Sequence, residues 1–278
     1  MLTINLALVS EVPGHDASDV ARVAASLQRQ VTRDFTPLWD VPATVDGFPK
    51  LEDVPVGYWP MIVETEIDTP GAAGVHEDKN GQPFALIAMS DSWSLTASHE
   101  MLEMLADPFG KRVIPGKSPK GDQGRVEILV EVCDPCEAAD FAYTVNDILV
   151  SDFITPRFYD PRQTPSVRYS FTGAVHGPRE ILRGGYISWR DPVSNHWWQE
   201  TWFGEGKAFK DLGVFDATAG SLRAWVDSQT EHPGIDHGLQ KTNPTLEAAV
   251  AGGHTTAESS AARAQAWREQ ISTLKATQ

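Results

Sequence analysis

The spacing of apolar residues changes from a period of two to a helical period within the first 35 residues. Residues 1–9 alternate Ile4, Leu6 and Leu8 with smaller or more polar side chains, which predicts a first strand. Residues 17–34 then carry apolar side chains at helical spacing, which predicts an amphipathic helix. The apolar positions of this helix are Val20, Val23, Ala24, Leu27 and Val31.

Most of the elements predicted after this helix are strands. Runs with the composition of strands cover residues 37–45, 59–67, 74–77, 84–89, 126–132, 143–145, 148–150, 186–190 and 196–203. Asn80-Gly81 separates two of these runs and is the strongest hairpin signal in the chain. A second helix is predicted at residues 92–106, and it ends before Pro108 because the residue before a proline avoids the helical region.

The C-terminal part of the chain shows weaker patterns. Residues 151–185 have no clear period and are expected to be rich in loops. Residues 232–256 are rich in glycine, histidine, threonine and proline, which is typical of a linker. Apolar side chains return at helical spacing in residues 257–278, which predicts a terminal amphipathic helix that docks on the body of the protein or on a protein partner.

The charge balance restricts the classes of partner. The chain has 23 basic and 38 acidic residues and a formal net charge of −15. A surface this negative repels phosphate backbones and anionic lipid surfaces, so we expect neither nucleic acid nor a membrane as a partner. Hydrophobic residues make up 41% of the chain, which is ordinary for a globular protein and excludes disorder as its global state.

Cysteine use and hydropathy favour an intracellular setting. The sequence contains two cysteines, Cys133 and Cys136, too few for a secreted domain held together by disulfides. No run approaches the roughly 18 consecutive apolar residues of a membrane span, and the N-terminal residues have no basic region typical of a signal peptide. We therefore expect a cytoplasmic location.

The segment with the clearest chemistry is the predicted helix at residues 92–106. On a helical wheel with about 100° per residue, Glu103 lies one turn from His99 on the same face, and Glu100 lies beside that pair. Leucine and methionine side chains occupy the opposite side of the wheel. Because buried carboxylates are costly unless they are paired or bind a metal, His99 and Glu103 are candidate ligands of one ion.

The motif His99-Glu100-Met-Leu-Glu103 resembles the zincin metallopeptidases, whose active-site helix carries His-Glu-x-x-His. The order of predicted elements over residues 1–140 is also similar to the upper lobe of that superfamily. The resemblance implies that His99 and Glu103 are metal ligands and that Glu100 is the general base. The chain departs from the family pattern because Glu103 stands where the second histidine belongs. A site with this extra carboxylate acidifies bound water less, and it suits manganese or calcium as well as zinc.

A third ligand is expected from the carboxylates that follow the strand at residues 126–132. In zincins of the glutamate type the third ligand is a downstream carboxylate, but the resemblance does not fix its position here. Glu131 and Asp134 are our first choices, because the end of a strand can direct a side chain into a cleft. Glu137 is next. The alternative is that these side chains lie at turns and strand edges in water.

Three further features of the sequence have more than one interpretation. The Cys133-Asp-Pro-Cys136 pair is most simply a pair of small buried residues, with metal and redox roles as alternatives. The tryptophans of residues 186–203 are either a stacking platform for a ligand or cross-strand pairs, and the second reading is favoured. Donors to an oxyanion include Tyr143, Tyr159, Tyr169 and His176, among which the sequence does not choose. The other histidines are interpreted as surface or loop residues: His15, His76, His196, His232, His237 and His254.

The sequence therefore predicts an α+β protein of zincin type, with a mixed twisted sheet packed on helices. Residues 1–160 would form the metal-binding catalytic domain and residues 161–231 a β-rich region, followed by the linker and the terminal helix. The favoured activity is hydrolysis of a peptide or protein substrate by a metal-activated water, with an extended substrate added to an edge strand near residues 84–89. The rival is a non-catalytic binding or structural protein on a degenerate zincin fold.

Overall fold

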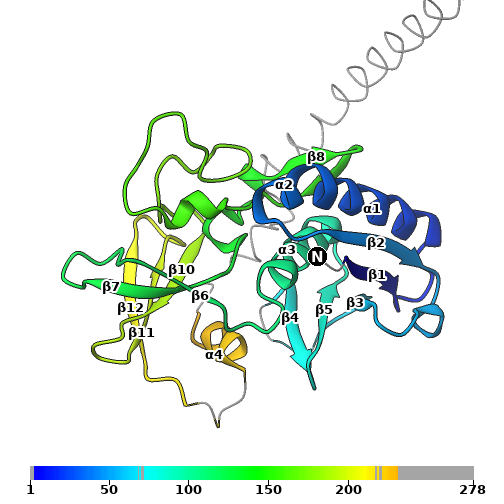
Figure 1. The fold of residues 1–278 in the computed structure, drawn as a ribbon. Helices are drawn as coiled ribbons and strands as arrows, with labels where there is room; N and C mark the ends of the chain where they lie inside the picture. The colour runs from blue at the N-terminus through cyan, green and yellow to red at the C-terminus, as the bar shows by residue number, and fades with distance from the viewer. Residues whose placement is uncertain (1–2, 68, 70–71, 217, 219–220, 231–278) are drawn as a thin grey trace, which may run out of the picture.

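Two five-stranded sheets lie side by side in the structure, a computed structural model that describes residues 3–67, 69, 72–216, 218 and 221–230 (Figure 1). The predicted linker at residues 232–256 and the predicted terminal helix at residues 257–278 lie outside the described residues. The element order confirms the α+β class, with a mixed sheet and helices first and an antiparallel sheet after them. No helix among the described residues is long and apolar enough to cross a membrane.

The first sheet has the strand order β2-β1-β3-β5-β4. Its strands are β1 (Ile4–Ser10), β2 (Ala43–Phe48), β3 (Trp59–Glu64), β4 (Gly74–Lys79) and β5 (Gln82–Ala88). All neighbours in the sheet are parallel except β4, which pairs antiparallel with β5 through the predicted Asn80-Gly81 turn. The hairpin prediction is confirmed. The prediction that the strand near residues 84–89 lies at the sheet edge is wrong, because this strand, β5, lies between β3 and β4. The edge strand is β4.

Two long helices pack beside this sheet. The first is α1 (Ala17–Gln30), capped by the Asp16 side chain, and it continues through a π-helical turn (Val31–Phe35) into α2 (Thr36–Trp39). The strand predicted at residues 37–45 is therefore wrong in its first half, because helical hydrogen bonding continues past Pro37, which lies in the first turn of α2, where a proline is tolerated. The second long helix is α3 (Trp93–Ala106), close to the predicted range 92–106.

The second sheet has the order β12-β11-β10-β7-β6 and is antiparallel throughout. Its strands are β6 (Val113–Lys117), β7 (Arg125–Leu129), β10 (Tyr186–Arg190), β11 (Trp197–Thr201) and β12 (Ala208–Gly213). Trp189 faces Trp198 across β10 and β11, which supports cross-strand pairing as the structural role of these tryptophans. The sequence did not indicate β6 or β12. Both are edge strands with exposed positions and a weak apolar alternation.

Shorter elements connect the two sheets. The predicted hairpin of β8 (Tyr143–Val145) and β9 (Ile148–Val150) is present, and residues 151–185 are mainly irregular, as predicted. Short 3-10 turns lie at Leu51–Asp53, Asp134–Cys136, Ala139–Phe141 and Pro156–Tyr159. The last described element is α4 (Leu222–Gln229), which the sequence did not predict.

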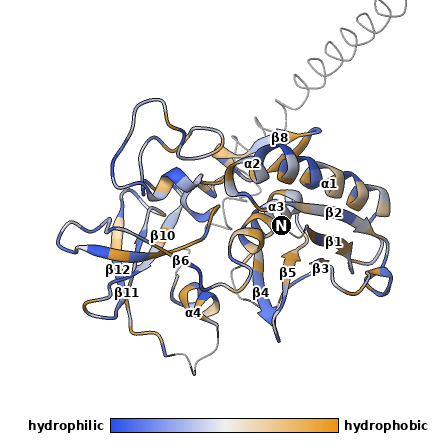
Figure 2. Ribbon diagram, viewed as in Figure 1, coloured by the Kyte–Doolittle hydropathy of each residue, from blue (hydrophilic) through white to orange (hydrophobic). Residues whose placement is uncertain are grey.

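One large hydrophobic cluster contains residues from both predicted domains. Leu6, Met101, Tyr169 and Trp189 are each no more than 1% exposed and belong to the same cluster. Apolar residues concentrate on β1 and β5, whereas the end of β4 is hydrophilic (Figure 2). Burial of this cluster fixes α3 between the sheets, so that its polar residues cannot simply face water. The proposed boundary at residue 160 remains a prediction.

Candidate metal centre

Helix α3 is anchored by hydrogen bonds that fix the rotation of its polar face. The Ser98 hydroxyl donates to Gln30 Oε1 of α1 at 2.8 Å and accepts from the Ser151 backbone N–H at 2.9 Å. Leu102 and Met101, the residues next to the motif positions, are fully buried in the core. With these contacts in place, His99, Glu100 and Glu103 must lie against neighbouring chain segments, and Glu103 is 0% exposed.

The structure brings His99, Glu103 and Asp134 together. His99 Nε2 lies 3.3 Å from Glu103 Oε2 and 3.3 Å from Asp134 Oδ1. Ligands bound tetrahedrally at about 2.0–2.2 Å from a zinc ion are separated from each other by roughly 3.3–3.6 Å. Each of the two distances therefore suits a pair of atoms that share one ion. Asp134 Oδ1 is also buried without a hydrogen-bond partner among the described residues, so it has an acceptor site available for a cation.

Backbone amides determine which oxygen of Glu103 points toward His99. Glu103 Oε1 accepts hydrogen bonds from the backbone N–H groups of Cys133, at 3.1 Å, and Asp134, at 3.3 Å. These bonds leave Oε2 directed at the imidazole. The two donor amides lie at the start of the 3-10 turn Asp134–Cys136, so the turn that supplies the Asp134 side chain also orients Glu103. Such supporting hydrogen bonds are a common feature of metal sites.

Arg223 of α4 provides a cation inside the cluster of carboxylates. Its Nη1 lies 3.0 Å from both Glu131 Oε2 and Asp134 Oδ2, and its Nη2 lies 3.4 Å from Glu103 Oε2. Its Nε lies 3.1 Å from Asp227 Oδ2. Glu131, one of the predicted ligands, thus has the guanidinium as its closest charged partner. The sequence pattern did not indicate Arg223, because a single arginine in a segment without a predicted element gives no local signal.

His76 corrects our interpretation of the scattered histidines. It lies on β4 and is 1% exposed, so the prediction of a surface or loop position for His76 is wrong. Its Nδ1 lies 3.5 Å from Glu100 Oε2 and 3.7 Å from Glu103 Oε2. These three side chains form one of the groups able to hold a metal ion, and Glu103, Glu131 and Asp134 form another. The error arose because most residues of β4 are polar, so the sequence does not show which side of the strand faces inward. Only the packing of α3 against β4 shows it.

Other predicted residues have different surroundings. Glu137 groups with His99 and Asp134, with potential ligand atoms within 4.8 Å of one another. Glu127 lies apart and accepts from Arg190 Nε at 2.8 Å. Cys133 and Cys136 are buried and unbridged, and burial raises the pKa of both thiols well above the usual value. They therefore remain protonated at neutral pH, which fits small buried residues better than a reactive dithiol.

The charges of the cluster are strongly coupled. Burial disfavours the imidazolium of His99, but Glu103 and Asp134 outweigh that effect and raise its pKa well above 6.5. Burial likewise disfavours the Glu103 carboxylate, yet His99 and Arg223 hold its pKa well below 4.5. Burial raises the pKa of Glu131 well above 4.5, and Arg223 opposes that shift only in part. Without an ion, the centre therefore takes up a proton on His99 to compensate its carboxylates.

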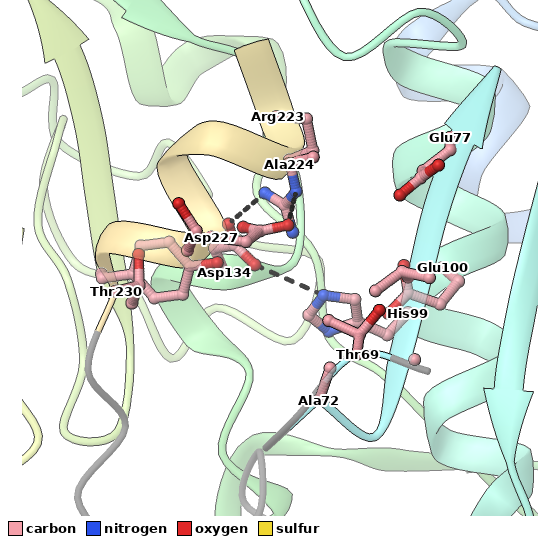
Figure 3. A pocket seen from close by; sticks show the side chains of 14 residues that line it. Thr69, Ala72, Glu77, His99, Glu100, Asp134, Arg223, Ala224, Asp227 and Thr230 are labelled. Carbon is pink, nitrogen blue, oxygen red and sulfur yellow. Dashed lines mark hydrogen bonds and ion pairs between the residues drawn. The ribbon is translucent and has the colours of Figure 1, made fainter. Parts of the chain in front are cut away.

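A cavity of about 460 Å³ opens beside this centre (Figure 3). Its walls come from α3, the edge strand β4 and α4, and both His99 and Glu100 line it. Tyr186 lines it too, whereas none of the four oxyanion donors considered from the sequence does. A cavity of this size can hold part of a peptide or a small ligand.

The comparisons with known proteins give no further guide to this centre. No protein-family model matches the chain, and neither the curated proteins nor the solved structures compared with it give a match. What the geometry shows by itself is a set of buried histidine, glutamate and aspartate side chains that can bind a metal ion.

Proposed function

We propose that the protein is a metal-dependent hydrolase of zincin type that cleaves a peptide or protein substrate. His99, Glu103 and Asp134 would hold one divalent ion. Glu131, the other downstream carboxylate considered as a ligand, would serve with Arg223 to balance charge behind the site. The order of strands and helices before α3 and the antiparallel edge strand beside it support the resemblance on which the peptidase assignment depends.

The observation that carries the proposal is that His99, beside a cavity, lies close to both a glutamate and an aspartate. His99 Nε2 is 3.3 Å from one oxygen of Glu103 and 3.3 Å from one oxygen of Asp134, although Asp134 is 31 residues beyond Glu103. A surface helix whose His and Glu side chains face water would leave these groups exposed and apart. Here Glu103 and Asp134 are buried, and the side chains of His99 and Asp134 line the cavity.

Zinc is our first choice of ion, and manganese and calcium are the alternatives. One imidazole and two carboxylates form a donor set that zinc accepts, and its oxygen content also suits the harder ions. When bound, a divalent ion polarises the substrate carbonyl and makes water more acidic. Because the ligands carry two negative charges, we expect the acidification to be weaker than at a site with histidine ligands.

Glu100 would act as the general base. Its carboxylate lines the same cavity as His99 and is 4% exposed, so it can take a proton from an attacking water and later pass that proton to the leaving amine. His76 Nδ1, 3.5 Å from Glu100 Oε2, would limit the orientations of this carboxylate. Tyr186 is a donor that lines the cavity and could stabilise an oxyanion.

Metal analysis and hydrolysis of fluorescein-labelled casein test the proposal together. Purified protein reconstituted with zinc, manganese or calcium should carry about one ion per chain. We expect Glu103→Ala and Asp134→Asn to lose the ion and hydrolysis, and Glu100→Gln to keep the ion and lose hydrolysis. Glu127→Gln is the matched control, since this carboxylate lies near the others in sequence but pairs with Arg190. Absence of a bound ion in the reconstituted wild type would refute the proposal.

The contacts of Arg223 favour one rival function. A guanidinium that already contacts Glu103, Glu131, Asp134 and Asp227 can stabilise the carboxylates without any metal. In that case the protein is a non-catalytic binding or structural protein on a similar fold. The same measurements separate the two functions, because the rival predicts no stoichiometric ion and no hydrolysis in any variant.

A further inference from the structure

The cavity beside the metal centre has an unpaired carboxylate on one wall. Glu77 lies on the edge strand β4, two residues after Val75, and both residues line the cavity because alternate residues of a strand share a face. Figure 3 shows the Glu77 carboxylate directed across the cavity toward α4. Among the described residues, this carboxylate takes part in no hydrogen bond or ion pair, unlike the buried carboxylates of α3 and of the 131–134 segment.

The opposite wall cannot supply a counter-charge to Glu77. Its cation is Arg223, whose nitrogens are already within 3.0–3.4 Å of Glu103, Glu131, Asp134 and Asp227. Asp227 lines the cavity as well, so α4 presents a carboxylate together with its arginine. A single divalent ion at His99, Glu103 and Asp134 would still leave more negative than positive charge around the cavity.

Two buried carboxylate oxygens beside the cavity also favour the binding of a cation. Glu100 Oε2 and Asp134 Oδ1 are buried without a hydrogen-bond partner among the described residues, and both side chains line the cavity. The negative potential of these carboxylates adds to that of Glu77. The walls of the cavity have a low dielectric constant, so charges inside it are less screened than at a free surface. A positively charged group that enters is therefore attracted, and an acidic group is repelled.

The geometry of β4 indicates how such a group is delivered. As the edge strand of the described sheet, β4 has one side without a neighbouring strand. An extended peptide can pair with that side through its backbone, and its alternate side chains then point into the cavity. Ser228 and Thr230 of the opposite wall offer hydroxyl groups to the peptide.

We propose that this cavity is a subsite for a basic side chain, with Glu77 as its counter-charge, and that the protein prefers peptides with arginine or lysine beside the bond to be cleaved. The effect of this preference on cleavage rests on the proposed function. The binding of the basic side chain does not, because it requires neither a metal ion nor hydrolysis, only the negative charge of the cavity wall with Glu77 as the counter-charge.

Binding of matched peptides to the full-length Glu100→Gln variant, measured with and without added zinc, tests the subsite without turnover. The probes are acetyl-Ala-Ala-Arg-Ala-Ala-amide and the same peptide with citrulline, an uncharged residue of nearly the same shape, in place of arginine. We expect the arginine peptide to bind about tenfold more tightly, since a hydrogen-bonded charge contributes enough to give that factor. The preference should fall to within about twofold in Glu100→Gln/Glu77→Gln and should decrease at high salt.

The control and the outcomes separate this inference from the proposed function. Glu127→Gln added to Glu100→Gln should leave the preference unchanged. Equal binding of both peptides, or an unchanged preference after Glu77→Gln, overturns the subsite even if the wild type hydrolyses casein. A Glu77-dependent preference in a protein that hydrolyses nothing supports the subsite and refutes only the catalytic proposal.

Discussion

At the scale of single residues, the centre depends on how a few charges compensate each other out of water. Arg223 lies among four carboxylates, and its side chain is 8% exposed. An ion pair this buried contributes little compared with apolar packing, but removal of one partner leaves the others uncompensated. The arginine is therefore expected to matter more for the metal-free protein than for the metal-bound one, in which a divalent ion shares its role.

Substitution of Arg223 tests this dependence. We expect Arg223→Met to reduce the free energy of unfolding of the metal-free protein by roughly 3–5 kcal/mol, because Glu131, Asp134 and Asp227 lose their counter-charge. Denaturant unfolding in the presence of a chelator measures the change. Arg183→Met is a comparison with an arginine outside the cluster. A loss below about 1 kcal/mol for Arg223→Met would show that water reaches these carboxylates.

Protonation of His99 makes metal affinity depend on pH. A metal ligand must be the neutral imidazole, and in the metal-free protein the pKa of His99 is raised well above 6.5, so the ion must displace a proton. Affinity should therefore rise with pH from 6 upward, by up to about tenfold per unit while His99 remains protonated before binding. Calorimetry in buffers of different ionisation enthalpy should detect about one proton released per ion at pH 7. Binding without proton release would mean that His99 is already neutral.

At the scale of elements, the contact between β4 and α3 shapes the centre. A Cβ placed on Gly74 would lie 2.6 Å from Thr96 Cγ2 and 2.7 Å from both Cγ and Oε1 of Glu100. Only a glycine lets the edge strand approach the helix closely enough for His76 to contact Glu100 and Glu103. The small residue in β4 and the polar face of α3 are thus two parts of one packing arrangement.

Gly74→Ala should displace Glu100 more than it affects the ligands. We expect hydrolysis of labelled casein to fall at least tenfold, while zinc stoichiometry stays near one per chain, because the atoms nearest to the added Cβ belong to Thr96 and Glu100 and not to the ligands. Gly121→Ala is the matched control, since a Cβ there meets nothing within 4 Å. Unchanged hydrolysis in Gly74→Ala would argue against Glu100 as the base or against the closeness of this packing.

At the scale of the whole molecule, the centre joins segments that are far apart in the chain. Its side chains come from β4, α3, the turn after β7 and α4, which together connect the first sheet to the second (Figure 1). An ion bound there stabilises the folded state as a whole, since the unfolded chain has no such arrangement of ligands.

Thermal unfolding should report this coupling. Free zinc at 100 times its dissociation constant adds about 2.7 kcal/mol to the free energy of unfolding, which corresponds to a rise in Tm of roughly 5–10 °C for a domain of this size. We expect the rise in the wild type and in Glu127→Gln and its absence in Glu103→Ala. A rise of equal size in Glu103→Ala would place the stabilising ion elsewhere.

The sequence by itself determined the motif helix, the hairpin before it, the α+β class and the neighbourhood of the third carboxylate. Each of these follows from local periodicity or turn chemistry, and a helix turn brings His99 and Glu103 together without help from the rest of the chain. Only the tertiary structure decided that Asp134 faces His99, that His76 is buried and that Arg223 lies among the carboxylates. Those contacts join residues up to 120 positions apart, the separation of Glu103 and Arg223, and they form only when the sheets, α3 and α4 pack around one core. No local pattern encodes such distances, because the free energy that fixes them comes from burial shared by the whole molecule.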